Sequence, residues 1–442
     1  MPAELLPILL LVSFVGLLLV GIPVAYAAAA TGVVFGLIGF GPGLFNLLPA
    51  RIYGVATDYS LLALPMFVFM GVMLEKSRLA NDMLEMIGHV AGGLRGGMAV
   101  GIIVFGVIMG ATTGIVGATI VLLGMIALPT LLKYRYDKSL ACGAICASGT
   151  LGQIIPPSLV LILLGEIMNE SVGTLFAAAL VPGLMLAALY IAYILVVAWR
   201  RPDAAPPIPA SERAALSRRD LWVRLVKGVA PALGLVLAVL GSIMAGVAAP
   251  TEAAAIGALG SLLIVALSGK LSRRVLKATC LDTLKTSAMI FFVIMTAQAF
   301  SLAFRGLGGE RLIQDVFTLI PGGTTTDILF FVVVLFIAGI LLEWVEISYI
   351  VLPLFLPYFI TQGVDMVWLA AIICIVLQTS FLTPPVGWSL FFLRGVAPAS
   401  VATSEIYRGV WPFIWIQLAA AALVLAFPPI ATWLPTAIGW AT

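Results

Sequence analysis

The chain has 442 residues, of which 62% are hydrophobic and 10% are charged. Soluble proteins carry about 25% charged residues, so this composition excludes a water-soluble globular protein and indicates a chain that crosses a bilayer several times. The net charge is only +3 and no basic patch lies outside short loops between apolar segments, so we expect a lipid bilayer and no nucleic acid as the chain's surroundings.

The first half is predicted to contain five membrane spans and one re-entrant helical hairpin. The spans cover residues 5–22, 24–40, 59–75, 139–168 and 173–199, and the hairpin covers about 96–132, with its turn near 112–119. Ala25-Tyr26-Ala27 imitates a signal-peptide cleavage site, but no positively charged segment precedes the apolar residues. We therefore interpret the N-terminal segment as the first span.

A polar segment, residues 200–227, separates the two halves, 1–199 and 228–442. It contains Pro202, Pro206, Pro207 and Pro209, followed by several arginines. This composition predicts a cytoplasmic linker along the membrane surface.

The second half is predicted to repeat the plan of the first half. Its spans cover residues 228–247, 253–268, 287–304, 367–393 and 410–427, and a second re-entrant hairpin covers about 327–360, with its turn near 341–347. The sequence offset that relates Pro156-Pro157 to Pro384-Pro385 also relates Asp137 to Asp365. We interpret these coincidences as a duplication.

The number of crossings predicts that the two halves are inverted. Five spans per half is an odd number, so the second half enters the membrane from the opposite side, as in many transporters. With both termini periplasmic, all basic residues except Arg51, Arg305 and Arg311 fall on the cytoplasmic side, in agreement with the positive-inside rule. The predicted fold class is an all-α polytopic membrane protein, with an inverted repeat, two re-entrant hairpins and two broken helices at 139–168 and 367–393.

Both broken helices carry polar and helix-breaking residues within apolar sequence, at 148–157 and 378–385. Proline removes a backbone donor and glycine permits unwinding, and such breaks are tolerated in membranes where they line a cavity or are buried. Free carbonyls at helix C-terminal ends can bind a cation, and helix N-termini attract a carboxylate. A proline-kinked packing helix is the alternative interpretation.

The hairpin turns add further candidate ligands. Gly110–Gly114 is rich in hydroxyl groups and lies between apolar segments, and the second turn contains Glu343 and Glu346. Carboxylates in an apolar context are functional candidates by default, as cation ligands or proton carriers. The alternative is a turn that lies in water at the periplasmic rim.

The chain resembles the large membrane subunit of tripartite ATP-independent periplasmic (TRAP) transporters over essentially its whole length. The motifs that carry the resemblance are Gly110–Gly114, Gly117–Thr119, Leu128-Pro129, Tyr136-Asp137, Ala147–Gly152, Ile155–Ser158, Ala249–Ala254, Leu352-Pro353, Leu356-Pro357 and Thr383–Gly387. The resemblance implies an elevator-type carrier of the ion-transporter superfamily in the bacterial inner membrane. It also implies Na⁺ coupling, organic-acid substrates, a small four-helix membrane subunit and a periplasmic solute-binding protein. Because the chain starts directly in the first span, we expect the small subunit to be a separate polypeptide.

The resemblance also implies roles for individual residues. The expected cation ligands are Thr112, Thr113, Gly114, Ser148, Gly149, Thr150, Glu343, Gln378, Thr379 and Ser380. The expected substrate-binding residues are Pro156, Pro157, Ser158, Thr383, Pro384 and Pro385. One acidic residue is usual near Glu343, so the additional Glu346 leaves its own role and the coupling details open.

Other functions have less support. A stand-alone Na⁺- or H⁺-coupled anion symporter of the same fold would need no binding protein. An intramembrane enzyme lacks a partner base, because the one histidine, His89, is predicted in a cytoplasmic loop. A channel fits inverted broken helices less well than alternating access does. We expect no organic cofactor and no metal other than Na⁺.

Overall fold

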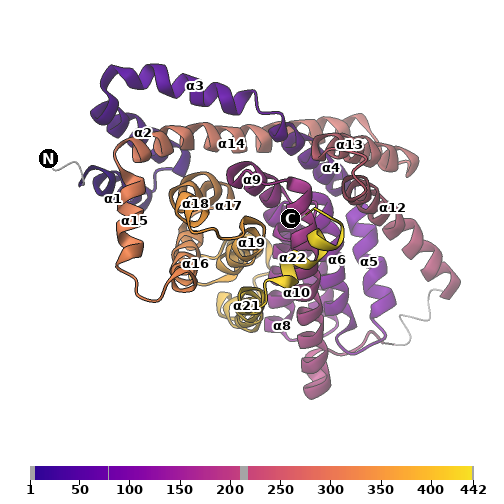
Figure 1. Ribbon diagram of the computed structural model, residues 1–442. Helices are drawn as coiled ribbons and strands as arrows, with labels where there is room; N and C mark the ends of the chain where they lie inside the picture. The colour runs from indigo at the N-terminus through magenta and orange to yellow at the C-terminus, as the bar shows by residue number, and fades with distance from the viewer. Residues whose placement is uncertain (1–4, 78, 210–217, 441–442) are drawn as a thin grey trace.

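The computed structural model describes residues 5–77, 79–209 and 218–440, and every regular element in these ranges is helical (Figure 1). Eight of the described segments are long and apolar enough to cross a membrane. The predicted fold class, an all-α polytopic membrane protein, is confirmed.

The described residues of the first half form ten α-helices. They are α1 (Leu5–Leu19), α2 (Val24–Phe40), α3 (Leu44–Ala56), α4 (Ala63–Lys76), α5 (Leu79–Ala91), α6 (Gly97–Thr113), α7 (Val116–Lys133), α8 (Lys138–Thr150), α9 (Leu159–Met168) and α10 (Val172–Arg200). Short 3₁₀ turns occur at η1 (Gly41–Gly43), η2 (Ser60–Leu62), η3 (Leu151–Gln153) and η4 (Pro202–Ala204).

The second half is described from α12 onward. Its helices are α12 (Arg218–Met244), α13 (Pro250–Leu267), α14 (Arg273–Gly306), α15 (Gly309–Thr318), α16 (Thr324–Leu341), α17 (Trp344–Glu346), α18 (Leu352–Thr361), α19 (Met366–Leu382), α20 (Trp388–Val396), α21 (Thr403–Ala426) and α22 (Pro429–Ala437). A π-helical turn, η5 (Ile347–Val351), joins α17 to α18.

Several helices lie outside the predicted spans or start before them, among them α3, α15 and α12. Helix α3 contains Pro49 and follows two glycines and Pro42, all of which resemble turn signals. Helix α15 is short and carries both charged and apolar residues, so its sequence does not resemble a membrane span. Helix α12 starts well before the predicted span, because Arg218 to Lys227 contains good helix formers and no proline. Residues 210–217 of the predicted linker lie outside the described residues.

Helix α14 forms one side of the molecule. It packs against α2 and α4, and Figure 1 shows α3 running beside it. The approach of α2 requires Gly32, because a Cβ there would lie 2.5 Å from the backbone of Ala299 and Phe300. An ion pair of 2.9 Å between Lys76 and Asp282 joins α4 to α14 near their cytoplasmic ends in the predicted topology.

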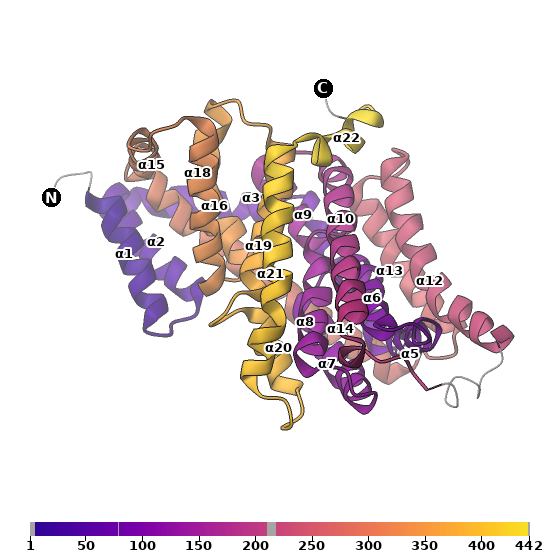
Figure 2. The ribbon, with the colours of Figure 1, turned by 90° about the horizontal axis from the view of Figure 1, so that it is seen from below.

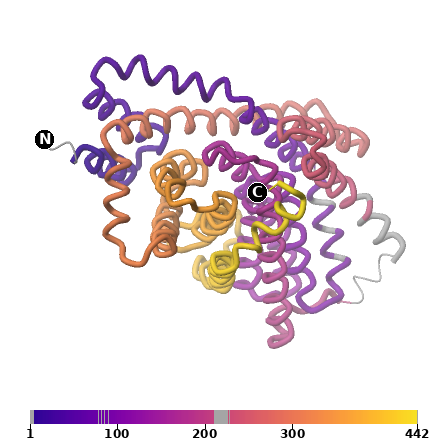
Figure 3. The backbone as a smooth tube through the Cα atoms, viewed as in Figure 1, coloured from indigo at the N-terminus to yellow at the C-terminus, as the bar shows by residue number. Residues whose placement is uncertain are grey.

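The centre of the molecule is built from both halves of the chain. In Figure 2, α8, α9 and α19 lie between α1 and α2 on one side and α12 and α13 on the other. The purple trace of α6–α10 and the orange to yellow trace of α16–α21 lie against each other in Figure 3, and α8 contacts α21, α10 contacts α19, and α7 contacts α20. Every residue from Leu140 to Leu159, and from Leu369 to Leu382, is buried.

Candidate ion and substrate sites

Both broken helices are interrupted at a Pro–Pro sequence. Helix α8 ends at Thr150, continues as η3, and resumes as α9 after Ser158, whereas α19 ends at Leu382 and α20 begins at Trp388. The Pro156–Pro157 and Pro384–Pro385 peptide bonds are both cis. Proline cannot donate a backbone hydrogen bond, and it disfavours helical geometry in the residue before it, so both helices end ahead of the proline pair.

The helices continue further than the sequence predicts. Ser148–Thr150 is the last turn of α8 and Gln378–Ser380 is still inside α19, although both segments were expected to be unwound. The reason is that a proline removes hydrogen bonds only within about one turn before it. These residues therefore present the C-terminal ends of helices, where the last four carbonyl groups lack helical partners.

Most hydroxyl groups of the expected cation site bond to carbonyls of their own helix. The donor–acceptor pairs are Thr112 to Met109 (3.0 Å), Thr113 to Met109 (2.9 Å), Thr150 to Ala147 (2.9 Å), Thr379 to Ile375 (2.6 Å) and Ser380 to Leu377 (2.7 Å). Ser148 differs, since its Oγ donates to the Ile102 carbonyl of α6 at 2.7 Å. A hydroxyl oxygen that donates its proton keeps lone pairs for a cation.

Each hairpin packs against the end of a broken helix through small residues. In the first half, Gly110 of α6 lies against Gly152, and a Cβ at Gly110 would be 2.6 Å from the Gly152 Cα. In the second half, Gly339 of α16 lies against Ser380 so closely that a Cβ would overlap the Ser380 Oγ. The chain turns at Gly114, with φ of 59°, in the first hairpin and at Leu342 and Glu343 in the second.

Four helix C-terminal ends thus meet in two pairs, α6 with α8 and α16 with α19. A helix C-terminus carries a partial negative charge, from unpaired carbonyl groups. Each pair combines two such ends with buried hydroxyl oxygens, Thr112 and Thr150 in the first pair and Thr379 in the second. This arrangement provides oxygen ligands and a negative potential for a monovalent cation in each half.

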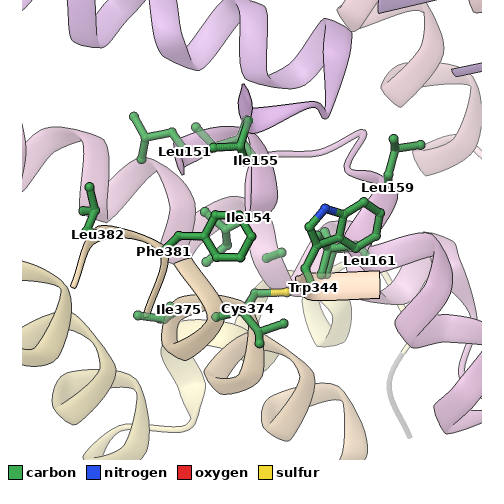
Figure 4. Packing of buried hydrophobic residues seen from close by; sticks show 14 of the residues in the cluster. Leu151, Ile154, Ile155, Leu159, Leu161, Trp344, Cys374, Ile375, Phe381 and Leu382 are labelled. Carbon is green, nitrogen blue, oxygen red and sulfur yellow. The ribbon is translucent and has the colours of Figure 1, made fainter. Parts of the chain in front are cut away.

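A pocket of about 370 Å³ lies between the two hairpin turns. The N-terminal ends of three helices line it, through Val116 of α7, Leu159 of α9 and Trp344 of α17. Helix N-termini carry a partial positive charge and favour anions. The apolar side chains of both breaks and of Trp344 gather in one buried cluster beside the pocket (Figure 4).

The six expected substrate-binding residues do not line this pocket. Pro156, Pro157 and Ser158 are buried, and the Ser158 Oγ donates to the Gln153 carbonyl at 2.6 Å. Thr383 donates to the Thr379 carbonyl at 2.8 Å.

Pro384 is half-buried and Pro385 is exposed, with the Pro385 carbonyl accepting a bond from the Tyr407 hydroxyl at 2.9 Å. The pocket is lined instead by the nearby residues Leu159 and Phe381. The structure therefore places the proline turns next to the pocket wall and not on it.

Two acidic residues line the pocket, Glu75 of α4 and Glu343 of the second turn. Glu343 also borders a larger pocket of about 910 Å³ against α1, α2 and α14. Glu346 has a structural role, because its Oε2 accepts the backbone N–H of Glu343 at 2.9 Å. Glu252 and Glu405 cap α13 and α21 in the same way, at 2.8 and 2.7 Å.

Other polar residues near these sites were not predicted. Tyr190 of α10 and Gln417 of α21 are fully buried close to Gln378, but none of their side-chain polar atoms forms a hydrogen bond of ordinary length and angle with another described residue. A polar residue inside a predicted span was the available signal. The neighbours of Tyr190 and Gln417, however, lie on helices that are distant in the sequence, so the sequence alone did not bring these residues together.

A second polar pocket, of about 490 Å³, lies between α3, α14 and α18. Asp58 and Glu166 both line this pocket, and their carboxyl groups lie close enough to interact. Arg51 and Arg305 line the same pocket, and Arg305 donates to the Pro353 carbonyl at 3.2 Å. This pocket joins the first broken helix to the α3–α4 connection.

Comparison with known proteins agrees with this architecture. Residues 11–430 match the family model described as "Tripartite ATP-independent periplasmic transporter, DctM component". The YdaH transporter of Alcanivorax borkumensis has a similar fold, with a TM-score of 0.61 at 14% identity, covering 88% of this chain and 90% of that one.

Two curated relatives align over nearly their full length. The C4-dicarboxylate TRAP transporter large permease protein DctM of Vibrio cholerae is 28% identical, with 97% of each chain covered. The ectoine TRAP transporter large permease protein TeaC of Halomonas elongata is 28% identical, covering 96% of this chain and 98% of the relative. The paired helix ends, the pocket between two hairpin turns and a family match that spans nearly the whole sequence lead to one conclusion: the chain belongs to the DctM family, the large permease subunits of TRAP transporters.

Proposed function

We propose that this chain is the carrier subunit of a Na⁺-driven transporter that imports an organic acid across the bacterial inner membrane. The observation that carries the proposal is the pairing of helix C-terminal ends beside a pocket lined by helix N-terminal ends. The paired C-terminal ends give a negative potential that favours a cation, and the N-terminal ends give a positive potential that favours a carboxylate. The relatives are named for C4-dicarboxylates and for ectoine, so the substrate class is broader than dicarboxylates alone.

One Na⁺ site forms in each half. The first uses the turn Thr112–Gly114 with the α8 end at Ser148–Thr150, and the second uses Glu343 with Gln378–Ser380 of α19. The carbonyls of Ser148 and Ser380 already accept bonds from the N–H groups of Leu151 and Thr383, so the free carbonyls beside them and the hydroxyl oxygens are the better ligands.

Binding is ordered, with Na⁺ before the organic acid. Glu75 and Glu343 line the pocket, and none of the described residues that line it is Lys or Arg, so an unneutralised pocket repels an anion. A Na⁺ ion next to Glu343 removes part of this repulsion and fixes the turns that frame the pocket. The Na⁺ gradient then controls how tightly the acid is held on each side of the membrane.

Movement follows an elevator scheme. The hairpins, broken helices, α10 and α21 move together because they pack on one another: α6 and α7 on α8, α16 on α19, α10 on α19, and α21 on α8 and α19. Helices α2, α4, α13 and α14 form the static frame, in which α14 packs on α2 and α4, and α13 packs on α4. A periplasmic binding protein delivers the acid, and a small four-helix membrane subunit completes the frame. In this scheme the two pockets that separate the moving part from α2, α3 and α14 change shape during transport.

Reconstitution tests the proposal. The cognate periplasmic binding protein is first screened with carboxylic acids and ectoine, and the acid that stabilises it is radiolabelled. Proteoliposomes containing this chain and the small subunit should accumulate the acid only with the loaded binding protein outside and an inward Na⁺ gradient. Equal uptake when choline replaces Na⁺ and only a proton gradient is applied would refute Na⁺ coupling. Uptake without the binding protein would favour a stand-alone symporter.

A further inference from the structure

Four buried polar side chains lie close together where α8, α10, α19 and α21 pack on one another. They are Thr150 at the end of α8, Tyr190 of α10, Gln378 of α19 and Gln417 of α21, and each is fully buried. The hydroxyl of Tyr190 faces the side chains of Gln417, Gln378 and Thr150. We call these four residues the central polar cluster.

The cluster is not explained by stability. Although these side chains lie close enough to interact, neither polar atom of Gln378 or of Gln417, nor the Tyr190 hydroxyl, forms a hydrogen bond of ordinary length and angle with another described residue. A buried amide or hydroxyl that loses water without a full replacement destabilises the fold. Apolar side chains of similar size would fill the same space without this cost, so the cluster requires another reason.

The cluster joins the two halves at equivalent positions. Thr150 and Gln378 are related by the same sequence offset as Pro156 and Pro384. Tyr190 and Gln417 are related by almost the same offset, and they lie on the two long helices that follow the broken helices. Each half therefore supplies one residue from its broken helix and one from the next long helix.

The cluster also lies next to the contacts that position both hairpins. In the last turn of α8, close to Thr150, Ser148 donates to the Ile102 carbonyl of the first hairpin. In α19, close to Gln378, Ser380 lies against Gly339 of the second hairpin. Tyr190 and Gln417 therefore lie between the two helix ends that contact the hairpins.

We propose that Tyr190 and Gln417 are positioning residues that couple the two cation sites, so that occupation of one half prepares the other. The inference rests on the proposed Na⁺ sites and goes beyond them, since neither residue is a proposed ligand. Coupling through buried polar groups gives cooperative binding because Na⁺ at one site removes part of the ordering cost at the other.

The test is equilibrium binding of ²²Na⁺ to the full chain purified with its small membrane subunit, measured for the wild type and for Tyr190→Phe and Gln417→Leu. The wild type should bind with a Hill coefficient above one. Each variant should bind with a coefficient near one and with half-saturation raised about five- to tenfold, and the double variant should resemble the single variants because they break one connection.

Tyr193→Phe is the matched control. Tyr193 lies on the same helix and packs on the same Phe413 ring as Tyr190, at 5.2 Å in both cases, but it is only half-buried and outside the cluster. It should leave the Hill coefficient unchanged. If Gln417→Leu does not fold, Tyr190→Phe decides, since it removes a single oxygen atom.

The outcomes separate this inference from the proposed function. Cooperative wild-type binding that persists in Tyr190→Phe, or wild-type binding with a Hill coefficient of one, would overturn the coupling and leave the Na⁺ sites standing. Wild-type protein that binds no ²²Na⁺ would overturn both.

Discussion

Glu343 is the residue whose position has the clearest chemical consequence. It borders both the pocket between the hairpin turns and the larger pocket against α1, α2 and α14. Its neighbour Glu346 is held in place by a bond to the Glu343 backbone. Glu346 lines the larger pocket too, but only Glu343 lines the pocket between the hairpin turns, so Glu343 is the carboxylate placed at that pocket and Glu346 the one that caps α17.

The change Glu343→Gln should raise the half-saturating Na⁺ concentration for uptake about tenfold, which corresponds to about 1.4 kcal/mol. The reason is that an amide keeps an oxygen ligand but loses the negative charge. Glu310→Gln, at an exposed ion pair with Arg305, is the control and should leave Na⁺ dependence unchanged. An unaltered Na⁺ dependence in Glu343→Gln would remove this carboxylate from the cation site.

Some residues of the candidate sites could be predicted from the sequence and others could not. Thr112, Ser148 and Glu343 could be selected because hydroxyls, glycines and carboxylates in apolar segments are unusual. Tyr190 and Gln417 could not, because each is surrounded by apolar residues in its helix and no motif near it in the sequence distinguishes it. Their meaning depends on partners that lie on other helices, far away in the sequence, and no local pattern reports such a pairing.

At the scale of elements, the beginning of each broken helix has the same cap. The Asp137 side chain accepts the Leu140 N–H at 2.9 Å, and the Asp365 side chain accepts the N–H groups of Val367 and Trp368 at 2.8 and 3.0 Å. The repeat offset that relates these two aspartates in the sequence thus corresponds to a shared structural role.

Replacing either cap by alanine, Asp137→Ala or Asp365→Ala, should lower the free energy of unfolding by about 1 kcal/mol. The corresponding asparagine variants should lose much less, because asparagine is an equally good cap. Thermal unfolding of the purified protein checks this result. Equal losses for alanine and asparagine would show that charge, and not capping, is what these residues contribute.

The contact between each hairpin and its broken helix leaves no room for a side chain. Gly110→Ala places a methyl group against the Gly152 backbone, and Gly339→Ala places one against the Ser380 hydroxyl. Overpacking of this kind typically costs about 1–3 kcal/mol, and it moves the helix ends that form the proposed cation sites. Both variants should therefore lose most Na⁺-dependent uptake while still inserting into the membrane.

Gly241→Ala is the matched control, because a Cβ there would meet no atom within 4 Å. It should transport like the wild type. Normal uptake by Gly110→Ala and Gly339→Ala would mean that the hairpin turns do not need their close contact with the broken helices.

The positions of the helix breaks and turns were easier to predict from the sequence than the residues at which the helices end. The Pro–Pro pairs located both breaks and Gly114 located the first turn, because proline and glycine act locally. The extent of unwinding was overestimated, since the helices continue to Thr150 and Leu382 under tertiary packing. Helix α3 was missed because Pro49 and the glycines before it resemble a turn.

At the scale of the whole molecule, the two halves form one buried core with two peripheral pockets. Length and composition mark α7, α16 and the α17–α18 segment as membrane spans, although the sequence predicts re-entrant hairpins there. Hydropathy does not distinguish a crossing helix from a hairpin arm of the same length. The short turns and the packing of the hairpin arms, and not their composition, therefore determine which arms cross the membrane.

The central claim is that the folded chain binds Na⁺, and thermal unfolding tests it most directly. The purified protein in detergent is titrated with NaCl against choline chloride at constant ionic strength. A ligand that binds only the folded state stabilises it by about 2.7 kcal/mol at a hundredfold excess over its dissociation constant. We predict a saturable rise in the unfolding temperature with Na⁺ and none with choline, whereas superimposable curves for the two salts would contradict Na⁺ binding.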